Sequence, residues 1–308
     1  QAVRCDTAAM SELSFGSVYL VRGSGITTTA SLTYSCRNDT PQPATICLNI
    51  GDPYGSFANR RLKQGSNDLR FQIYQDAART MVWGTGWGGP ATPPKTLVVA
   101  AGARISGTLP IHAAILPGQD AVPGPYSASY AGNGTLINYR AGSSGACSTG
   151  DPAVGQASIF PFHVSANVVK ACLVTAGLAA DVNLGTVSAD AINTAANGRI
   201  AVTCSQSTPY VIGLHPSNGS TTGSGTMSAT TGGADRVPYQ LYQDPGMRLE
   251  WGHADGPAGN GVRGTGTGRP QSHTVYVRAP SADYRPGRYS DTVTVIVSYR
   301  QADFTPDT

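Results

Sequence analysis

Charged residues are scarce in this chain. Only 13% of its 308 residues are Asp, Glu, Lys or Arg, and the formal net charge is +3. No run of basic residues stands beside interleaved aromatic residues, which is the pattern typical of nucleic-acid-binding proteins. The composition therefore argues against a nucleic-acid partner.

Long apolar runs are also missing. No stretch approaches the ~18 residues that a membrane-spanning helix needs. The N-terminal residues QAVRC do not form a signal peptide, so we expect that any leader has been removed. Hydrophobic residues nevertheless make up 40% of the chain, which is enough for buried cores.

Recognisable catalytic and metal-binding motifs are absent as well. The sequence has no H-E-x-x-H, no G-x-S-x-G and no C-x-x-C pattern. Its histidines are far apart: His112, His163, His215, His253 and His273. We therefore expect no enzyme, no cofactor and no metal. A hydrolase whose carboxylates converge only in the folded chain stays open as an alternative.

Turn-forming residues, in contrast, are abundant, with 38 glycines and 21 prolines. Short segments rich in β-branched and aromatic residues lie between them, and no long segment has a helical period. This pattern predicts an all-β protein.

One segment of the chain occurs twice. Residues 71–84 read FQIYQDAARTMVWG, and residues 239–252 read YQLYQDPGMRLEWG, an offset of 168 that also relates Cys36 to Cys204. Further ordered matches follow after a small insertion. The repeat indicates two homologous domains in tandem.

We place these domains at 1–169 and 170–308. Each copy shows several short strands separated by turns, so we expect two immunoglobulin-like β-sandwiches.

The repeat also sorts the six cysteines. An even number of widely spaced cysteines favours disulfides and an oxidising compartment. Cys5–Cys36 and Cys172–Cys204 are expected as equivalent bridges, which leaves Cys47–Cys147 by elimination. Six cysteines allow 15 pairings, so other connectivities stay open.

By this pattern, the second domain is one strand short. Its last strong strand is 289–299, and only RQADFTPDT follows. The first domain has an additional alternating segment at 157–171, which we expect to close that domain from within the same chain. Its apolar members are Phe160, Phe162, Val164, Ala166 and Val168. A disordered linker is the alternative interpretation of this segment.

A sandwich with a missing strand leaves an apolar groove that invites aggregation. We therefore expect the second domain to receive a strand from another polypeptide, as in chaperone–pilin complexes. The expected acceptor edge consists of Thr292, Val293, Val295 and Val297.

Several motifs resemble those of the spore coat protein U domain. They are LGTV at 184–187, YQLYQD at 239–244 with a following Trp-Gly, and PGRYSD at 286–291 ahead of VTVIVSY. This family builds the pilins of archaic chaperone–usher pili in Gram-negative bacteria. The resemblance implies three partners, which are a periplasmic chaperone, an outer-membrane usher and an adjacent pilin subunit.

Only four residues precede Cys5, which is too few for a donor strand. A subunit that receives a strand but does not donate one fits only the end of a fibre. The two-domain layout resembles the tip adhesin of that pilus class, secreted through the periplasm to the cell surface. An ordinary shaft subunit is the less favoured alternative.

A tip adhesin needs a binding surface. We expect loops 37–43, 84–94 and 141–156 at the end of the first domain that lies away from the second. Candidate contacts with an abiotic or host surface are Trp87, Pro90, Pro93, Pro94, Tyr139 and Val154. A stiff loop with an exposed Trp offers apolar contact at low entropic cost. The alternatives are a glycan-specific lectin, and a loop that folds back on its own sandwich.

Overall fold

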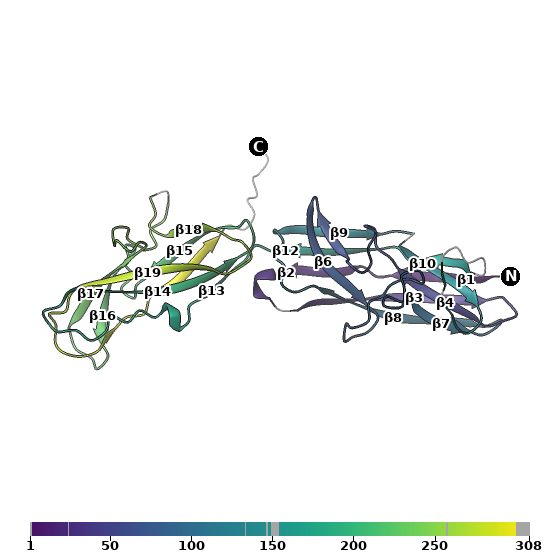
Figure 1. The fold of residues 1–308 in the computed structure, drawn as a ribbon, viewed down its shortest axis with the longest axis horizontal. Helices are drawn as coiled ribbons and strands as arrows, with labels where there is room; N and C mark the ends of the chain where they lie inside the picture. Colours follow the sequence, from purple (N-terminus) through teal and green to yellow (C-terminus); the bar gives the residue numbers. More distant parts are fainter. Residues whose placement is uncertain are drawn as a thin grey trace. The chain divides into compact units, whose positions relative to one another are not determined.

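The computed structural model describes residues 2–23, 25–132, 134–145, 147–148, 154–256 and 258–299. The chain divides into two compact units, Gln1–Val169 and Lys170–Thr308. Both consist of β-strands, with two short 3-10 turns at Leu20–Arg22 and Leu178–Ala180 (Figure 1). The predicted all-β class is therefore confirmed. In the described part of the chain, no helix is long and apolar enough to cross a membrane.

The first unit has a large and a small sheet. The order in the large sheet is β1-β3-β8-β6-β5-β9-β12-β2, and the order in the small sheet is β11-β10-β4-β7. The large sheet contains β1 (Val3–Met10), β2 (Leu13–Val18), β3 (Ile26–Asn38), β5 (Arg61–Gln64), β6 (Asn67–Tyr74), β8 (Arg104–Ile115), β9 (Gly124–Tyr130) and β12 (Phe162–Val168). The small sheet contains β4 (Ala44–Ile50), β7 (Lys95–Val99), β10 (Thr135–Ala141) and β11 (Val154–Ile159).

The second unit repeats this plan with fewer described strands. Its sheets have the orders β13-β14-β19-β17-β16-β20 and β18-β15-β21. The first of them contains β13 (Cys172–Thr175), β14 (Ile192–Cys204), β16 (Ser224–Ala229), β17 (Arg236–Tyr242), β19 (Gln271–Ser281) and β20 (Tyr289–Ser290). The second contains β15 (Pro209–His215), β18 (Val262–Thr265) and β21 (Thr294–Tyr299).

The repeated segment forms the same capped turn in both units. The carboxylate of Asp76 accepts hydrogen bonds from the backbone N–H groups four and five residues further on, and Asp244 does the same. Within each turn one non-glycine residue has a left-handed backbone, Arg79 with φ 58° and Met247 with φ 54°. A local carboxylate cap stabilises this otherwise unfavourable geometry.

A tryptophan follows each turn and anchors it in the core. The indole Nε1 of Trp83 donates to the carbonyl of Leu48 at 2.9 Å, and Trp251 donates to Ile212 at 2.9 Å. Both tryptophans are buried. The sequence repeat therefore encodes a turn together with its attachment to the opposite sheet.

Candidate functional site

The segment expected to close the first unit forms two strands, not one. β11 pairs with β10 in the small sheet, whereas β12 lies between β9 and β2 in the large sheet. The break falls at Phe160 and Pro161, where the chain passes from one sheet to the other. Because proline has no N–H to donate to a ladder, the change of sheet at this position is physically reasonable. The expectation of a single strand over 157–169 is thus corrected.

The alternating side chains of this segment are part of the first core. All five are buried: Phe160, Phe162, Val164, Ala166 and Val168. β12 is antiparallel to β9 and parallel to β2, so it has a hydrogen-bonded neighbour on each side. The segment is therefore a structural element of the first unit and not a linker.

The corresponding edge of the second unit is formed by β20 and β21. Ile137 of β10 pairs with Leu48, and Val297 of β21 pairs with Ile212. Leu48 and Ile212 accept the equivalent tryptophan hydrogen bonds, so Ile137 and Val297 are equivalent positions. Ile137 is fully buried, whereas Val297 is only partly buried.

Among the described residues, β21 pairs only with β15, and β20 pairs only with β16. We refer to residues 289–299 as the open edge. Val293, Val295 and Val297 pack partly buried against the second core, and Ile296 is 44% exposed. Thr292 is exposed, and it lies with Val293 just before β21. The expected acceptor residues therefore begin outside the strand and continue along it.

The other neighbour of β12 also has an unpaired counterpart. FGSV of β2 (15–18) corresponds to LGTV at 184–187, and the two glycines have similar backbones, with φ 66° at Gly16 and φ 80° at Gly185. Val18, in the strand beside β12, is fully buried, whereas Val187 is 47% exposed. Residues 184–187 belong to no strand. In the first unit, β12 lies between two segments. The second unit has counterparts of both, residues 184–187 and the open edge.

The loop 84–94 was expected at the same end as loop 37–43, and this expectation is wrong. Loop 37–43 leads into the start of β4, at Ala44, whereas the N–H of Ile50, at the end of β4, donates to Gly84. The length of β4 separates the two loops. The physical reason is the Trp83 anchor, which places the start of loop 84–94 beside the last residues of β4.

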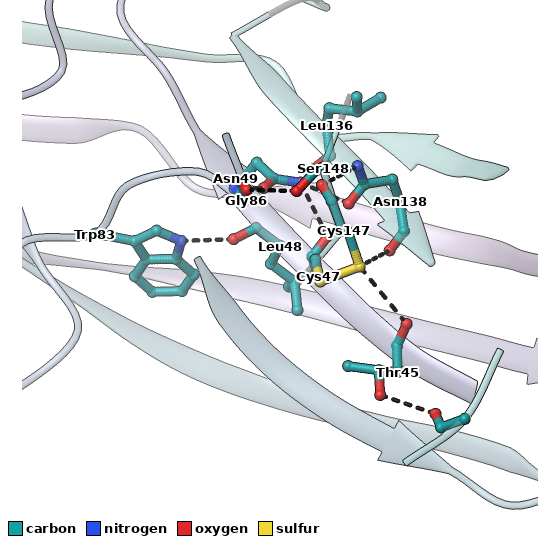
Figure 2. Close-up of a disulfide and its surroundings, with 11 residues drawn as sticks. Thr45, Cys47, Leu48, Asn49, Trp83, Gly86, Leu136, Asn138, Cys147 and Ser148 are labelled. Carbon is teal, nitrogen blue, oxygen red and sulfur yellow. Dashed lines mark hydrogen bonds between the residues drawn. A yellow bond between two sulfur atoms is a disulfide. The ribbon is translucent and has the colours of Figure 1, made fainter. Parts of the chain in front are cut away.

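The base of loop 84–94 is fastened beside the Cys47–Cys147 disulfide (Figure 2). The backbone N–H of Gly86 donates to Asn49 Oδ1 at 2.8 Å. Asn49 in turn donates to Asn138 Oδ1 at 2.9 Å. A Cβ atom at Gly86 would lie 2.3 Å from the carbonyl oxygen of Cys147, so only glycine fits. These contacts fold the loop's base back on its own unit.

The part of the loop beyond this base remains partly exposed to solvent. Trp87 is 38% exposed and Pro90 is exposed, while Pro93 and Pro94 are half-buried. Pro93 and Pro94 line an open surface pocket of about 380 Å³ together with Met81, which is 48% exposed. Met81, which the sequence did not single out, thus shares this pocket with the two prolines of the loop.

Tyr139 and Val154 lie in strands and not in loops. Tyr139 belongs to β10 and Val154 begins β11, and both are half-buried. The ring of Tyr139 covers Gly155 of the neighbouring strand, since a Cβ at that glycine would lie 2.5 Å from the ring. Residues 146 and 149–153 of the expected loop lie outside the described residues. Tyr139 and Val154 themselves belong to sheet surface.

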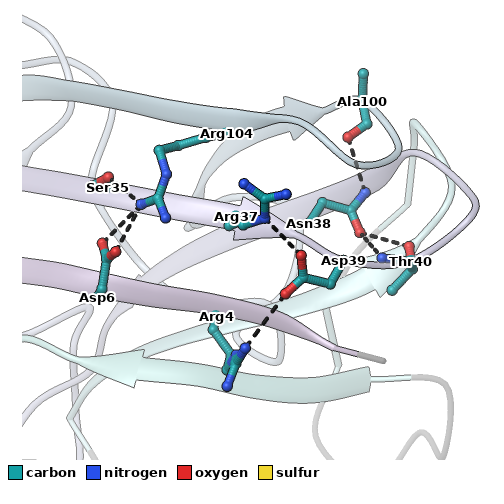
Figure 3. A network of polar contacts seen from close by, with 9 residues as sticks. All are labelled: Arg4, Asp6, Ser35, Arg37, Asn38, Asp39, Thr40, Ala100 and Arg104. Carbon is teal, nitrogen blue, oxygen red and sulfur yellow. Dashed lines mark hydrogen bonds and ion pairs between the residues drawn. The ribbon is translucent and has the colours of Figure 1, made fainter.

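The end of the unit near loop 37–43 is polar (Figure 3). Arg37 and Arg4 both contact the carboxylate of Asp39, and Arg104 contacts Asp6. Hydrogen bonding to Arg37 lowers the pKa of Asp39, and hydrogen bonding to Arg104 lowers the pKa of Asp6. This end of the unit is therefore charged, whereas Trp87 and Met81 are exposed apolar residues elsewhere in the unit.

The three disulfides in the structure are Cys5–Cys36, Cys47–Cys147 and Cys172–Cys204. The first and third join equivalent strand pairs of the two units. Within the described ranges, no group of three or more His, Cys, Asp or Glu side chains is arranged to hold a metal ion.

No curated protein matches this sequence. Among solved structures, the chain is similar to one in the CsuC–CsuE chaperone–tip adhesion subunit complex from archaic chaperone–usher Csu pili of Acinetobacter baumannii. That likeness has 15% identity and a TM-score of 0.49, and it covers 94% of this chain and 99% of that chain. The chain is also similar to the CupB6 tip adhesin from Pseudomonas aeruginosa, with 13% identity, a TM-score of 0.32, and coverage of 99% and 95%.

The family is shown by a match between the sequence and a family model. The model of the Spore Coat Protein U domain matches residues 1–130 and again residues 158–296. These two matches cover most of the chain and fall on both units, so the family resemblance predicted from the sequence motifs is confirmed. The chain belongs to the Spore Coat Protein U domain family.

Proposed function

We propose that this protein is the tip adhesin subunit of a chaperone–usher pilus. The observation that carries the proposal is the difference between the two units. The first unit contains β12 between β9 and β2. In the second unit the equivalent flanks, 184–187 and the open edge, expose apolar side chains.

The open edge is suited to β-strand addition. A strand with unpaired backbone groups beside an apolar surface binds an extended segment through main-chain hydrogen bonds and side-chain contacts. Left uncovered, Val187 and Ile296 favour aggregation. A periplasmic chaperone supplies the first strand, an outer-membrane usher receives the complex, and the adjacent pilin supplies the final strand.

The first unit needs no such partner, because its own β11 and β12 complete its sheets. It is therefore free to attach the cell to an abiotic or host surface from the pilus tip. Attachment runs through exposed apolar residues of this unit, namely Trp87, Pro90 and Met81. An exposed indole on a loop fastened at its base provides a large rigid contact.

The assembly part is tested by placing a charge at the open edge. Val297→Asp in the full chain should abolish the complex with the chaperone and the display of the subunit on pili, because a carboxylate disrupts the contact surface. Thr265→Asp, on an exposed residue of β18 at the other edge of the same sheet, is the matched control and should leave both intact. Normal chaperone binding by Val297→Asp would refute donor-strand acceptance.

The attachment part is tested separately on assembled fibres. Trp87→Asp should keep normal pilus display while binding to hydrophobic plastic falls strongly. Arg70→Asp, which also changes an exposed residue of this unit, is the control. Binding that is instead inhibited by a free sugar and indifferent to Trp87 would favour a lectin-type adhesin.

A further inference from the structure

Asp291 is the one charged residue of the open edge. It follows Ser290, the last residue of β20, and precedes Val293 by two positions. Its carboxylate is half-buried and accepts hydrogen bonds from the hydroxyl groups of Tyr239 and Ser217. Tyr239 is only 5% exposed and belongs to the second core, so these bonds hold the carboxylate against that core.

Tyr239, which donates to this carboxylate, is itself held in place by the neighbouring strand. The ring of Tyr239 lies over Gly225 of the neighbouring strand, and a Cβ atom there would lie 2.2 Å from the ring. The ring therefore occupies a space that exists only because residue 225 is glycine. Asp291 therefore accepts one of its hydrogen bonds from a side chain whose position the strand packing fixes.

The first unit has an apolar residue at the equivalent position. Tyr126 of β9 corresponds to Tyr289 at an offset of 163, and the same offset relates Ala128 to Asp291. Ala128 is buried, and its cross-strand partner in β12 is Val164. In the first unit, two small apolar side chains thus meet at this point of the ladder.

The same register applied to the second unit places a donor residue opposite Asp291. Side chains of directly opposed residues have Cβ atoms about 4.5–5.5 Å apart, within reach of a hydrogen bond. A valine at that point would shield the carboxylate from solvent without offering it a hydrogen bond in exchange. A buried charge that loses hydrogen bonds is strongly unfavourable.

We propose that Asp291 selects the donor strand of the second unit. It favours a donor with a hydrogen-bonding side chain, such as Thr, Ser or Lys, at the position opposite Asp291, and it disfavours an aliphatic residue there. The selectivity excludes β12 of a second copy of this chain, which carries Val164 at that position. The second unit thereby distinguishes the strand of another subunit from its own first unit's strand. This inference rests on the proposed donor-strand acceptance.

The test uses the full chain and two labelled peptides. One peptide has the sequence of residues 157–169, and the other carries Val164→Thr, which exchanges a methyl group for a hydroxyl at nearly equal size. We expect the Val164→Thr peptide to bind about tenfold more tightly, the lower end for a hydrogen bond to a charged group. In a chain with Asp291→Ala, this preference should vanish or reverse. Thr265→Ala, on an exposed residue of β18 outside the open edge, is the control and should retain the preference.

The possible results separate the two proposals. Peptide binding to a chain with Val297→Asp measures any binding outside the open edge. This amount is subtracted from the binding to the other chains. Equal binding of the two peptides to the wild-type chain would overturn the role of Asp291 but leave donor-strand acceptance in place. Binding of neither peptide would overturn donor-strand acceptance and the selectivity with it.

Discussion

The rings of Tyr130 and Phe162 stack with centroids 4.7 Å apart and planes 8° from parallel, which joins β9 to β12 within the first core. At the offset that relates Tyr126 to Tyr289, Val293 of the second unit takes the place of Tyr130. Val293 is only partly buried. The same point of the fold is thus filled in one unit and uncovered in the other.

Truncation of this stacked pair should destabilise the first unit. Phe162→Ala removes a buried ring, so we expect a loss of about 3–5 kcal/mol in the free energy of unfolding. Denaturant unfolding of the full chain, with the transitions of the two units assigned separately, measures this loss. Ile296→Ala, on the exposed side of β21, should change stability by no more than about 0.5 kcal/mol. A loss below about 1 kcal/mol for Phe162→Ala would contradict the core role of β12.

The capped turn at Asp76 should make the first unit sensitive to acid. Hydrogen bonds from the Thr80 hydroxyl and from the Met81 and Thr80 backbone N–H groups lower the pKa of Asp76 from 3.8 to about 2. A carboxyl group with a lowered folded pKa stabilises the fold above its unfolded pKa, and this contribution disappears as the pH falls towards 2. Asp76→Asn should therefore lower the melting temperature at pH 7 more than at pH 2.5.

For Asp76, the control is Asp283→Asn, which changes an exposed aspartate of the second unit. It should alter the melting temperature of the first unit at neither pH. An Asp76→Asn effect of the same size at both pH values would mean that the charge of the cap contributes nothing.

The second unit should lose stability at a higher pH than the first. The rings of His215 and His253 stack with centroids 3.5 Å apart. Desolvation, followed by repulsion from His253, lowers the pKa of His215 below 6.5, and Asp255 opposes this shift. The unfolded chain then binds protons more readily than the folded chain, so stability falls as the pH drops through 6.5. Thermal melts of the full chain between pH 7.5 and pH 5 measure the effect.

His253→Gln should reduce this loss, because it removes the repulsion that helps to lower the pKa of His215. His163→Gln, on an exposed histidine of the first unit, should leave the loss unchanged. Equal acid sensitivity in all three proteins would rule out the histidine pair as its origin.

The Cys47–Cys147 disulfide should stabilise the loop that carries Trp87. It closes a separation of 100 residues. Replacement of both cysteines by serine should therefore lower the stability of the first unit by about 2–4 kcal/mol. Because Gly86 packs on Cys147, amide hydrogen exchange in 84–94 should also accelerate. Replacement of Cys172 and Cys204 is the comparison, and it should leave exchange in that loop unchanged.

Short-range patterns accounted for much of the architecture. The repeated YQD turn, the strands of both units and the alternation of 157–168 depend on neighbouring residues and on the side-chain period of a strand. The sequence shows that Pro161 has no backbone N–H to donate to a strand partner. It does not show that the chain passes from one sheet to the other there. A change of sheet depends on which strands are already paired, which a one-dimensional pattern does not contain.

The candidate surface shows the same division. The sequence indicated Trp87 because it has no counterpart in the second copy, but it did not indicate Met81, which lies six residues earlier at the end of the capped turn. It also placed loop 84–94 beside loop 37–43. Only the contacts of Gly84 with Ile50 and of Gly86 with Asn49 show that the loop lies at the other end of β4.

The sequence by itself determined that this protein is a tandem pair of β-domains of one family, because repeats and strand periodicity are written in the order of residues. Tertiary structure decided how deeply equivalent positions of the two copies are buried. It buried Val18 and Ile137, and it left Val187 exposed and Val297 only partly covered. It also brought Asp291 to Tyr239, a contact between residues 52 positions apart that depends on how the strands pack.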